Sequence, residues 1–109
     1  HNTGGGLPGN LERILGKVDR GAIVDHPFPA HQSMLALQKL GNVEDAEAYK
    51  TWNMGVGMII VVEESQANEV IAIARKHNIP AQVMGEVTEK PGITIVSQGY
   101  FGRGLKLEF

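Results

Sequence analysis

The chain has 109 residues, of which 42% are hydrophobic and 20% are charged, as in a small globular domain. Its formal net charge of -2 gives no electrostatic reason to expect nucleic acid as a partner. The longest apolar run, residues 58–62, is far shorter than the roughly 18 residues of a membrane-spanning helix, and the absence of cysteine excludes disulfides and thiolate sites. These features predict a cytoplasmic protein with neither nucleic acid nor membrane as a partner.

Apolar spacing and helix stop signals predict the elements of the first half of the chain. Gly16 ends one apolar stripe and Gly41 ends a longer one, as glycine does after a helix. The expected elements are a helix over residues 10–16, a strand over 22–24, a proline-containing loop over 25–29, and helices over 30–40 and 44–50.

The second half begins with an uninterrupted apolar, β-branched run, which predicts a central strand covered on both faces. Ser65 is the expected N-cap of the helix that follows. The expected elements are a strand over residues 57–62, a helix over 65–77, and strands over 82–88, 93–96 and 105–109. The first of these strands, the helix and the next strand suit a right-handed parallel crossover, and the tail should be antiparallel.

This order of elements predicts an α/β fold in which a layered sheet has helices packed on it, partly in ferredoxin-like order. The sequence contains no repeat, linker or low-complexity tract. We therefore expect residues 1–109 to form one domain at most, and the short chain favours dependence on neighbouring structure.

Glycine is about twice as frequent as usual, with 14 residues, and it clusters at three places. Gly4-Gly5-Gly6 leads into a predicted helix, where backbone amides and the helix dipole can hold a phosphate. The alternative is a flexible connector. Asn53 and Gly55 precede the apolar run, where the glycine permits either close approach of a ligand or backbone, or a tight turn.

Isolated polar residues add candidates for chemistry. His1 is suited to proton transfer near neutral pH, and the Thr3 hydroxyl to donating a hydrogen bond to a phosphate oxygen. The other three histidines are dispersed and lack metal-ligand spacing, so we predict no metal site built from protein ligands alone.

Two further groups have simpler structural explanations. The acids Glu44, Asp45 and Glu47 suit the start of a helix, which favours a solvated face over paired catalytic carboxylates. The aromatic residues Tyr49 and Trp52 are expected to pack over the end of the sheet, with stacking on a purine as the alternative.

Three segments taken together resemble the aminoimidazole ribonucleotide synthetase family, also called phosphoribosylformylglycinamidine cyclo-ligase. They are His1-Asn2-Thr3-Gly4-Gly5-Gly6-Leu7, Asn10-Leu11-Glu12-Arg13-Ile14-Leu15 and Thr51-Trp52-Asn53-Met54-Gly55-Val56-Gly57-Met58. The resemblance extends from His1 to about Gly85, and the glycine-rich tail over residues 89–109 departs from it. It implies the C-terminal domain type of this superfamily, with the chain as the second half of that domain and an N-terminal ATP-binding domain missing.

The resemblance implies an ATP-dependent ring closure in purine biosynthesis. Formylglycinamidine ribonucleotide becomes aminoimidazole ribonucleotide, and ADP and phosphate are released. ATP, with Mg²⁺, would activate the formyl oxygen before an amidine nitrogen attacks, and most of those ligand sites would lie outside this chain. A homodimer is also implied.

Carried over by motif, His1 is the candidate for proton transfer or charge stabilisation. The candidate contacts to the phosphorylated ribonucleotide substrate are Thr3, Gly4, Gly5, Gly6, Asn10, Asn53 and Gly55. Two alternatives remain: another ATP-dependent superfamily member, such as formylglycinamide ribonucleotide amidotransferase, and a non-catalytic regulatory module that binds an anion. If the chain is a fragment of the cyclo-ligase, we expect it to be inactive alone.

Overall fold

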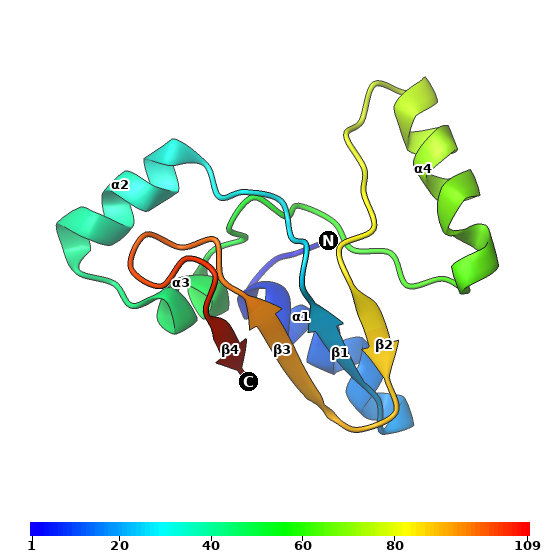
Figure 1. Cartoon of the computed structure of the whole chain (residues 1–109), viewed down its shortest axis with the longest axis horizontal. Coiled ribbons are helices and arrows are strands. Elements are labelled where there is room, and N and C mark those ends of the chain that lie inside the picture. Colours follow the sequence, from blue (N-terminus) through cyan, green and yellow to red (C-terminus); the bar gives the residue numbers. More distant parts are fainter.

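The computed structural model describes residues 1–109 and arranges them as a four-stranded sheet with helices behind it and at its ends (Figure 1). The helices are α1 (Gly6–Leu15), α2 (Gln32–Gly41), α3 (Asp45–Thr51) and α4 (Ala67–Lys76), with short 3-10 turns at Gly16–Val18 and Glu64–Gln66. The strands are β1 (Gly21–Val24), β2 (Glu86–Thr88), β3 (Gly92–Val96) and β4 (Lys106–Glu108). The predicted α/β class with helices layered on a sheet is confirmed. No helix combines the length and apolar character needed to cross a membrane.

The strands lie in the order β2-β1-β3-β4. The two central strands, β1 and β3, are parallel, and each edge strand is antiparallel to its neighbour. The expected antiparallel tail is confirmed for β3 and β4. The preceding strand, β2, pairs instead with β1, so the chain passes from one edge of the sheet to its centre between β2 and β3.

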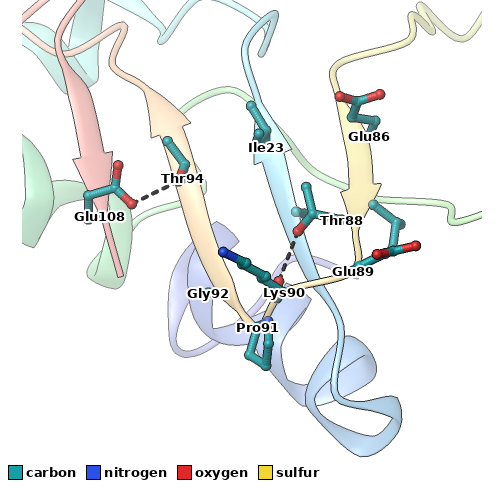
Figure 2. A pocket seen from close by; sticks show the side chains of 11 residues that line it. Ile23, Glu86, Thr88, Glu89, Lys90, Pro91, Gly92, Thr94 and Glu108 are labelled. Atoms are coloured by element: carbon teal, nitrogen blue, oxygen red, sulfur yellow. Dashed lines mark hydrogen bonds between the residues drawn. The ribbon is translucent and has the colours of Figure 1, made fainter.

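One face of the sheet is open and mixed in character (Figure 2). Ile23 and Thr94 project from the central strands, and the Thr94 hydroxyl donates to a carboxylate oxygen of Glu108 at 2.8 Å. A shallow concavity of about 540 Å³ on this face is lined by Glu86, Glu89, Glu108 and Lys90 among others. Three carboxylates against one ammonium group repel an anionic ligand.

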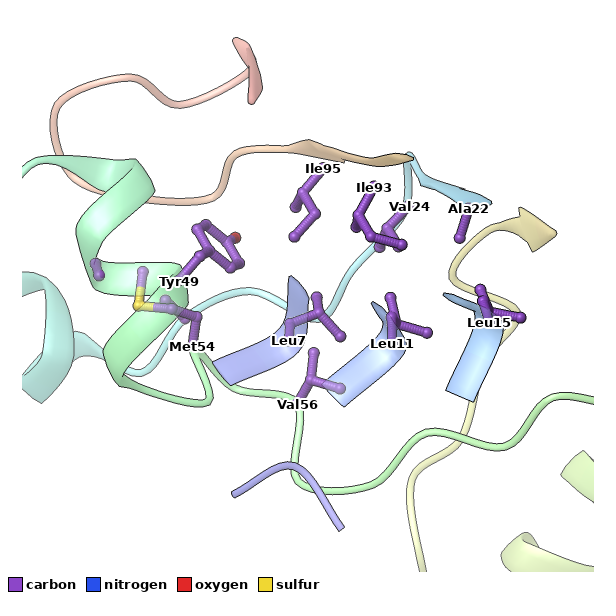
Figure 3. Packing of buried hydrophobic residues seen from close by; sticks show 12 residues of the cluster. Leu7, Leu11, Leu15, Ala22, Val24, Tyr49, Met54, Val56, Ile93 and Ile95 are labelled. Carbon is purple, nitrogen blue, oxygen red and sulfur yellow. The ribbon is translucent and has the colours of Figure 1, made fainter. Parts of the chain in front are cut away.

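The opposite face carries the hydrophobic core (Figure 3). Leu7, Leu11 and Leu15 recur every four residues along α1, and each is at most 3% exposed. They pack against the inward side chains of β1 and β3. Tyr49 and Met54 extend the core beyond the end of the sheet, and Val56 lies on the side of Leu7 that faces away from β3. Burying each leucine contributes about 1.5–3 kcal/mol, so this stripe holds α1 to the sheet.

The first helix begins at Gly6, earlier than the predicted start near Asn10. Gly5 and Gly6 take left-handed conformations that turn the chain sharply, and the Gly6 amide donates to the carbonyl of Thr3. Pro8 fits the first turn because its missing amide hydrogen has no partner there in any helix. The helix therefore gains the turn that carries Leu7.

The predicted central strand at residues 57–62 is wrong. Residues 58–62 form no backbone hydrogen bond, and Met58, Ile60 and Val61 are 57%, 58% and 44% exposed. The parallel crossover built on this strand is therefore wrong too, and the strand predicted at 82–88 is reduced to β2. Apolar, β-branched composition signals burial against a neighbour, but a strand exists only where such a neighbour pairs with it.

The helix predicted over residues 65–77 is confirmed as α4, with a shifted start. A 3-10 turn precedes it, and Gln66, not Ser65, occupies the N-cap position. The side chain of neither residue caps the helix, since no side-chain hydrogen bond is present there.

Candidate functional site

The fold places the first and last of the three motif segments side by side. The Asn2 amide donates to the carbonyl of Gly57 at 2.9 Å, and the Asn2 side chain donates to the carbonyl of Val56 at 2.7 Å. Residues more than fifty positions apart are thus joined by a buried asparagine. Asn2 is not among the predicted site residues, although a polar residue enclosed within the first motif was a signal for it.

Asn10, on α1, forms hydrogen bonds to backbone carbonyls of the glycine turn. Its side-chain amide donates to the carbonyl of Gly6 at 2.6 Å and lies 3.1 Å from the carbonyl of Thr3. Its own side-chain oxygen accepts from Arg13 at 3.3 Å. The side chain is buried and engaged on every side, so the structure gives Asn10 a role in shaping the turn.

With those carbonyls bound to Asn10, the turn presents free donors. The backbone amides of Thr3, Gly4 and Gly5 donate no hydrogen bond within the chain, and all three residues are exposed. They lie at the N-terminus of α1, where the helix dipole adds partial positive charge. Such a group of amides is suited to an anion, although neither of the two large concavities of this chain is lined by it.

The third motif segment forms a second turn, around Gly55, which packs closely against another part of the backbone. Gly55 has a φ of +91° and its amide donates to the side-chain oxygen of Asn53 at 3.0 Å. A β-carbon at this position would overlap the carbonyl oxygen of Pro29. Both explanations for this glycine hold: it lies in a tight turn closed by the Val56 amide, which donates to the carbonyl of Asn53 at 2.9 Å, and the backbone of the 25–29 loop approaches it closely.

The eight predicted site residues thus fall into two neighbouring turns connected by Asn2. His1, Thr3, Gly4 and Gly5 are exposed, Gly6 and Asn10 are buried, and Asn53 and Gly55 are half-buried. The side chain of His1 makes no hydrogen bond or ion pair. Their contacts with substrate stay predictions.

The burial of Asp45 contradicts the prediction that the acidic residues at the start of α3 form a solvated face. Glu44 and Glu47 are exposed, but Asp45 is buried and accepts from the hydroxyl of Ser97, the side-chain amide of Gln38 and two backbone amides of the 99–104 loop. It is an internal acceptor around which the glycine-rich loop folds, and a β-carbon at Gly99 would overlap its carboxylate. Only the fold brings these donors to one carboxylate.

The expected packing of Tyr49 and Trp52 is confirmed. Tyr49 is fully buried and Trp52 is half-buried against the core. The Tyr49 hydroxyl oxygen accepts from the backbone amide of Gln98 at 3.0 Å. Burial raises the pKa of Tyr49 above its ordinary value of 10.0, because the phenolate would lose its hydration.

Tyr49→Phe should lower the free energy of unfolding by about 1–2 kcal/mol, because the Gln98 amide loses its acceptor. The raised pKa of Tyr49 favours the neutral phenol in the folded chain. Its contribution is therefore present below pH 10 and is lost as the pH rises through the folded-state pKa. Urea unfolding between pH 8 and pH 11 checks both effects, and an equally steep alkaline loss in Tyr49→Phe would contradict the second.

The histidines remain dispersed in the fold. His26 contacts Asp25 at 3.1 Å, with both side chains exposed, and this hydrogen bond lowers the pKa of Asp25. Nowhere do three histidine, aspartate or glutamate side chains gather in a group that could hold a metal ion.

Comparison with known proteins identifies the family. Residues 1–98 match the C-terminal domain of AIR synthase related proteins. The chain belongs to this family. It is 44% identical over 92 residues to the phosphoribosylformylglycinamidine cyclo-ligase of Methanocaldococcus jannaschii, covering 82% of this chain and 25% of that protein.

Two further relatives carry the same name. The Methanopyrus kandleri protein is 37% identical over 100 residues, covering 92% of this chain and 28% of the relative. The Staphylococcus carnosus protein is 36% identical over 99 residues, covering 91% of this chain and 29% of the relative. The chain thus spans little more than a quarter of the curated relatives it matches.

Proposed function

We propose that residues 1–109 act as the second half of the C-terminal domain of an ATP-dependent cyclo-ligase. The reaction is closure of the imidazole ring of aminoimidazole ribonucleotide from formylglycinamidine ribonucleotide. The chain's contribution is to bind a phosphate-bearing ligand and to hold the imidazole of His1 beside it. The other superfamily activities find no specific support in the geometry.

One observation carries this proposal: the first motif forms a turn whose free amides lie at a helix N-terminus, next to the second motif. Asn10 binds the carbonyl side of the turn, so the amides of Gly4 and Gly5 stay available. The anchoring of Asn2 to Val56 and Gly57 sets the position of His1 relative to the second turn. Positioning of this kind is where a cyclisation gains most of its rate.

In the proposed reaction, ATP supplies the energy that makes the formyl oxygen a leaving group. The residues of this chain bind the phosphate group and assist proton transfer. The amides of Gly4 and Gly5 donate to phosphate oxygens, and the Thr3 hydroxyl donates to the same phosphate group. The His1 imidazole transfers a proton or stabilises charge during ring closure. The exposed turn then needs a wall from another part of the enzyme, which agrees with the expected inactivity of the chain alone.

A chimera tests the function directly. Residues 1–109 would replace the matched segment of the M. jannaschii cyclo-ligase, and release of ADP that depends on formylglycinamidine ribonucleotide would be measured. We expect turnover by the chimera and none by the isolated chain. A folded chimera without turnover would contradict the cyclo-ligase assignment. Combined with tight binding of inorganic phosphate by the isolated chain, it would favour the regulatory module instead.

In that chimera, His1→Ala should lower kcat about 100-fold, within the range that a positioned acid or base contributes. The melting temperature should stay within about 2 °C of the parent, because the His1 side chain makes no contact that stabilises the fold. His31→Ala is the matched control, since His31 is also exposed but precedes α2. Equal loss of kcat in both variants would remove His1 from the chemistry.

A further inference from the structure

Asn2 joins the two motif turns through both its backbone and its side chain. Its backbone amide donates to the carbonyl of Gly57 at 2.9 Å, and its side-chain amide donates to the carbonyl of Val56 at 2.7 Å. Its side-chain oxygen accepts from the side chain of Asn10 at 3.1 Å. Because Asn2 is only 9% exposed, water competes little for these hydrogen bonds, which strengthens each of them.

The hydrogen bonds around Asn2 run in one direction. Arg13 donates to the side-chain oxygen of Asn10, Asn10 donates to that of Asn2, and Asn2 donates to the carbonyl of Val56. A guanidinium group can only donate and a backbone carbonyl can only accept, so the two ends of this chain fix the orientation of both side-chain amides. A reversed Asn2 amide would set two oxygens against each other at Val56. The position of Asn2 is therefore specified by its neighbours.

The backbone to which Asn2 binds is fixed by the hydrophobic core. Val56 is buried and Met54, two residues earlier, is fully buried, and both belong to the core cluster. Figure 3 shows Val56 beside Leu7 of α1. Packing of this density allows little movement. Asn2 is thus held by a rigid part of the molecule, although the glycine turn that follows it is exposed.

His1 has no comparable support of its own. It is exposed, and its side chain makes no hydrogen bond or ion pair. Its Cα lies about 3.8 Å from that of Asn2, because the two residues share a peptide bond. A group that takes part in a reaction must be held to within about 0.5 Å by packed and hydrogen-bonded neighbours. For His1, Asn2 is the neighbour with those contacts.

We propose that Asn2 is a positioning residue of the cyclisation: its side chain, held between Asn10 and the carbonyl of Val56, fixes the backbone that carries His1. This inference rests on the proposed function, because Asn2 acts through His1. The phosphate-binding turn has a separate support, since Asn10 also donates to the carbonyls of Thr3 and Gly6. Loss of the Asn2 side chain should therefore slow the chemical step and leave binding of the phosphorylated substrate nearly unchanged.

The test is a double-mutant cycle in the chimera with the M. jannaschii cyclo-ligase. Asn2→Ala should lower kcat about 30-fold, within the roughly 100-fold that a misplacement of about 1 Å can cause. The KM for formylglycinamidine ribonucleotide should change less than about threefold. In the His1→Ala background the same substitution should lower kcat less than about threefold, because the group through which Asn2 acts is already absent. Tyr49→Phe, which also removes one buried hydrogen bond to the backbone, is the matched control and should keep kcat within about twofold of the parent.

Three results would overturn the role of Asn2: an unchanged kcat, a change confined to KM, or equal losses of kcat in the parent and His1→Ala backgrounds. The last would make Asn2 a support of the fold alone. Circular dichroism checks that each variant folds, and if Asn2→Ala does not, Asn2→Ser replaces it in the cycle with the same expected pattern. An active parent with an unaffected Asn2 variant refutes only this inference, whereas an inactive parent chimera refutes the proposed function.

Discussion

Gly6→Ala should lower the free energy of unfolding by about 4 kcal/mol, the sum of backbone strain and overpacking in a close contact. Gly6 has a φ of +61°, a conformation that disfavours a side chain. A β-carbon there would overlap the carbonyl oxygen of Tyr49, on α3. Since both partners are backbone, the contact can relax only by separating α1 from α3. Guanidinium unfolding followed by circular dichroism measures the loss.

Gly4→Ala is the control for this effect. Gly4 has no positive φ, and a β-carbon there would meet nothing within 4 Å, so the free energy of unfolding should change by less than about 0.5 kcal/mol. If Gly6→Ala proved as stable as Gly4→Ala, the glycine turn would not be packed against α3. The first motif would then lack the anchoring on which its shape depends.

Asp45→Ala should destabilise the chain by about 3–5 kcal/mol, because it removes a buried hydrogen-bond acceptor and leaves its donors without a partner. The Gln38 side chain, the Ser97 hydroxyl and the Gly102 amide all lose their partner. The 99–104 loop should therefore loosen first. Hydrogen exchange at the Phe101 and Gly102 amides, together with urea unfolding, measures the local and the global effect.

Glu44→Ala provides the comparison within the same helix. Glu44 is exposed at the N-cap position and makes no capping hydrogen bond, so its removal should change the free energy of unfolding by less than about 0.5 kcal/mol. Asp45→Asn should fall between the two, since it keeps one oxygen but turns an NH₂ group toward donors. Equal stability of Asp45→Ala and the parent would contradict a role for Asp45 in holding the loop.

The local sequence pattern was enough to predict the helices and the strand that end at a recognisable glycine, asparagine or proline stop signal. The strand over 22–24 and the helix stopped by Gly41-Asn42 appear close to their predicted bounds, because periodicity and a left-handed stop such as Asn42 are properties of neighbouring residues. The first helix ends near Gly16 as predicted, but Gly16 is right-handed and continues into a 3-10 turn, and the helix starts four residues early, at Gly6. The motifs were likewise sufficient to indicate the family, which the match over residues 1–98 confirms. The match runs past Gly85 to residue 98, so the family pattern extends further than predicted, and only residues 99–109 of the glycine-rich tail lie outside it.

Partners distant in sequence decided the rest. The run at 58–62 is apolar enough for a central strand, yet it has no strand beside it in this chain, and pairing is not a property of one segment. Asp45 has the pattern of a helix-start acid, and only the return of residues 97–102 over α3 makes it a buried acceptor. Thus the sequence by itself determined the presence of the helices and the family, and it marked the glycine segments without deciding their form. The tertiary structure alone decided which backbone groups find partners, because hydrogen bonding and burial depend on what lies across space.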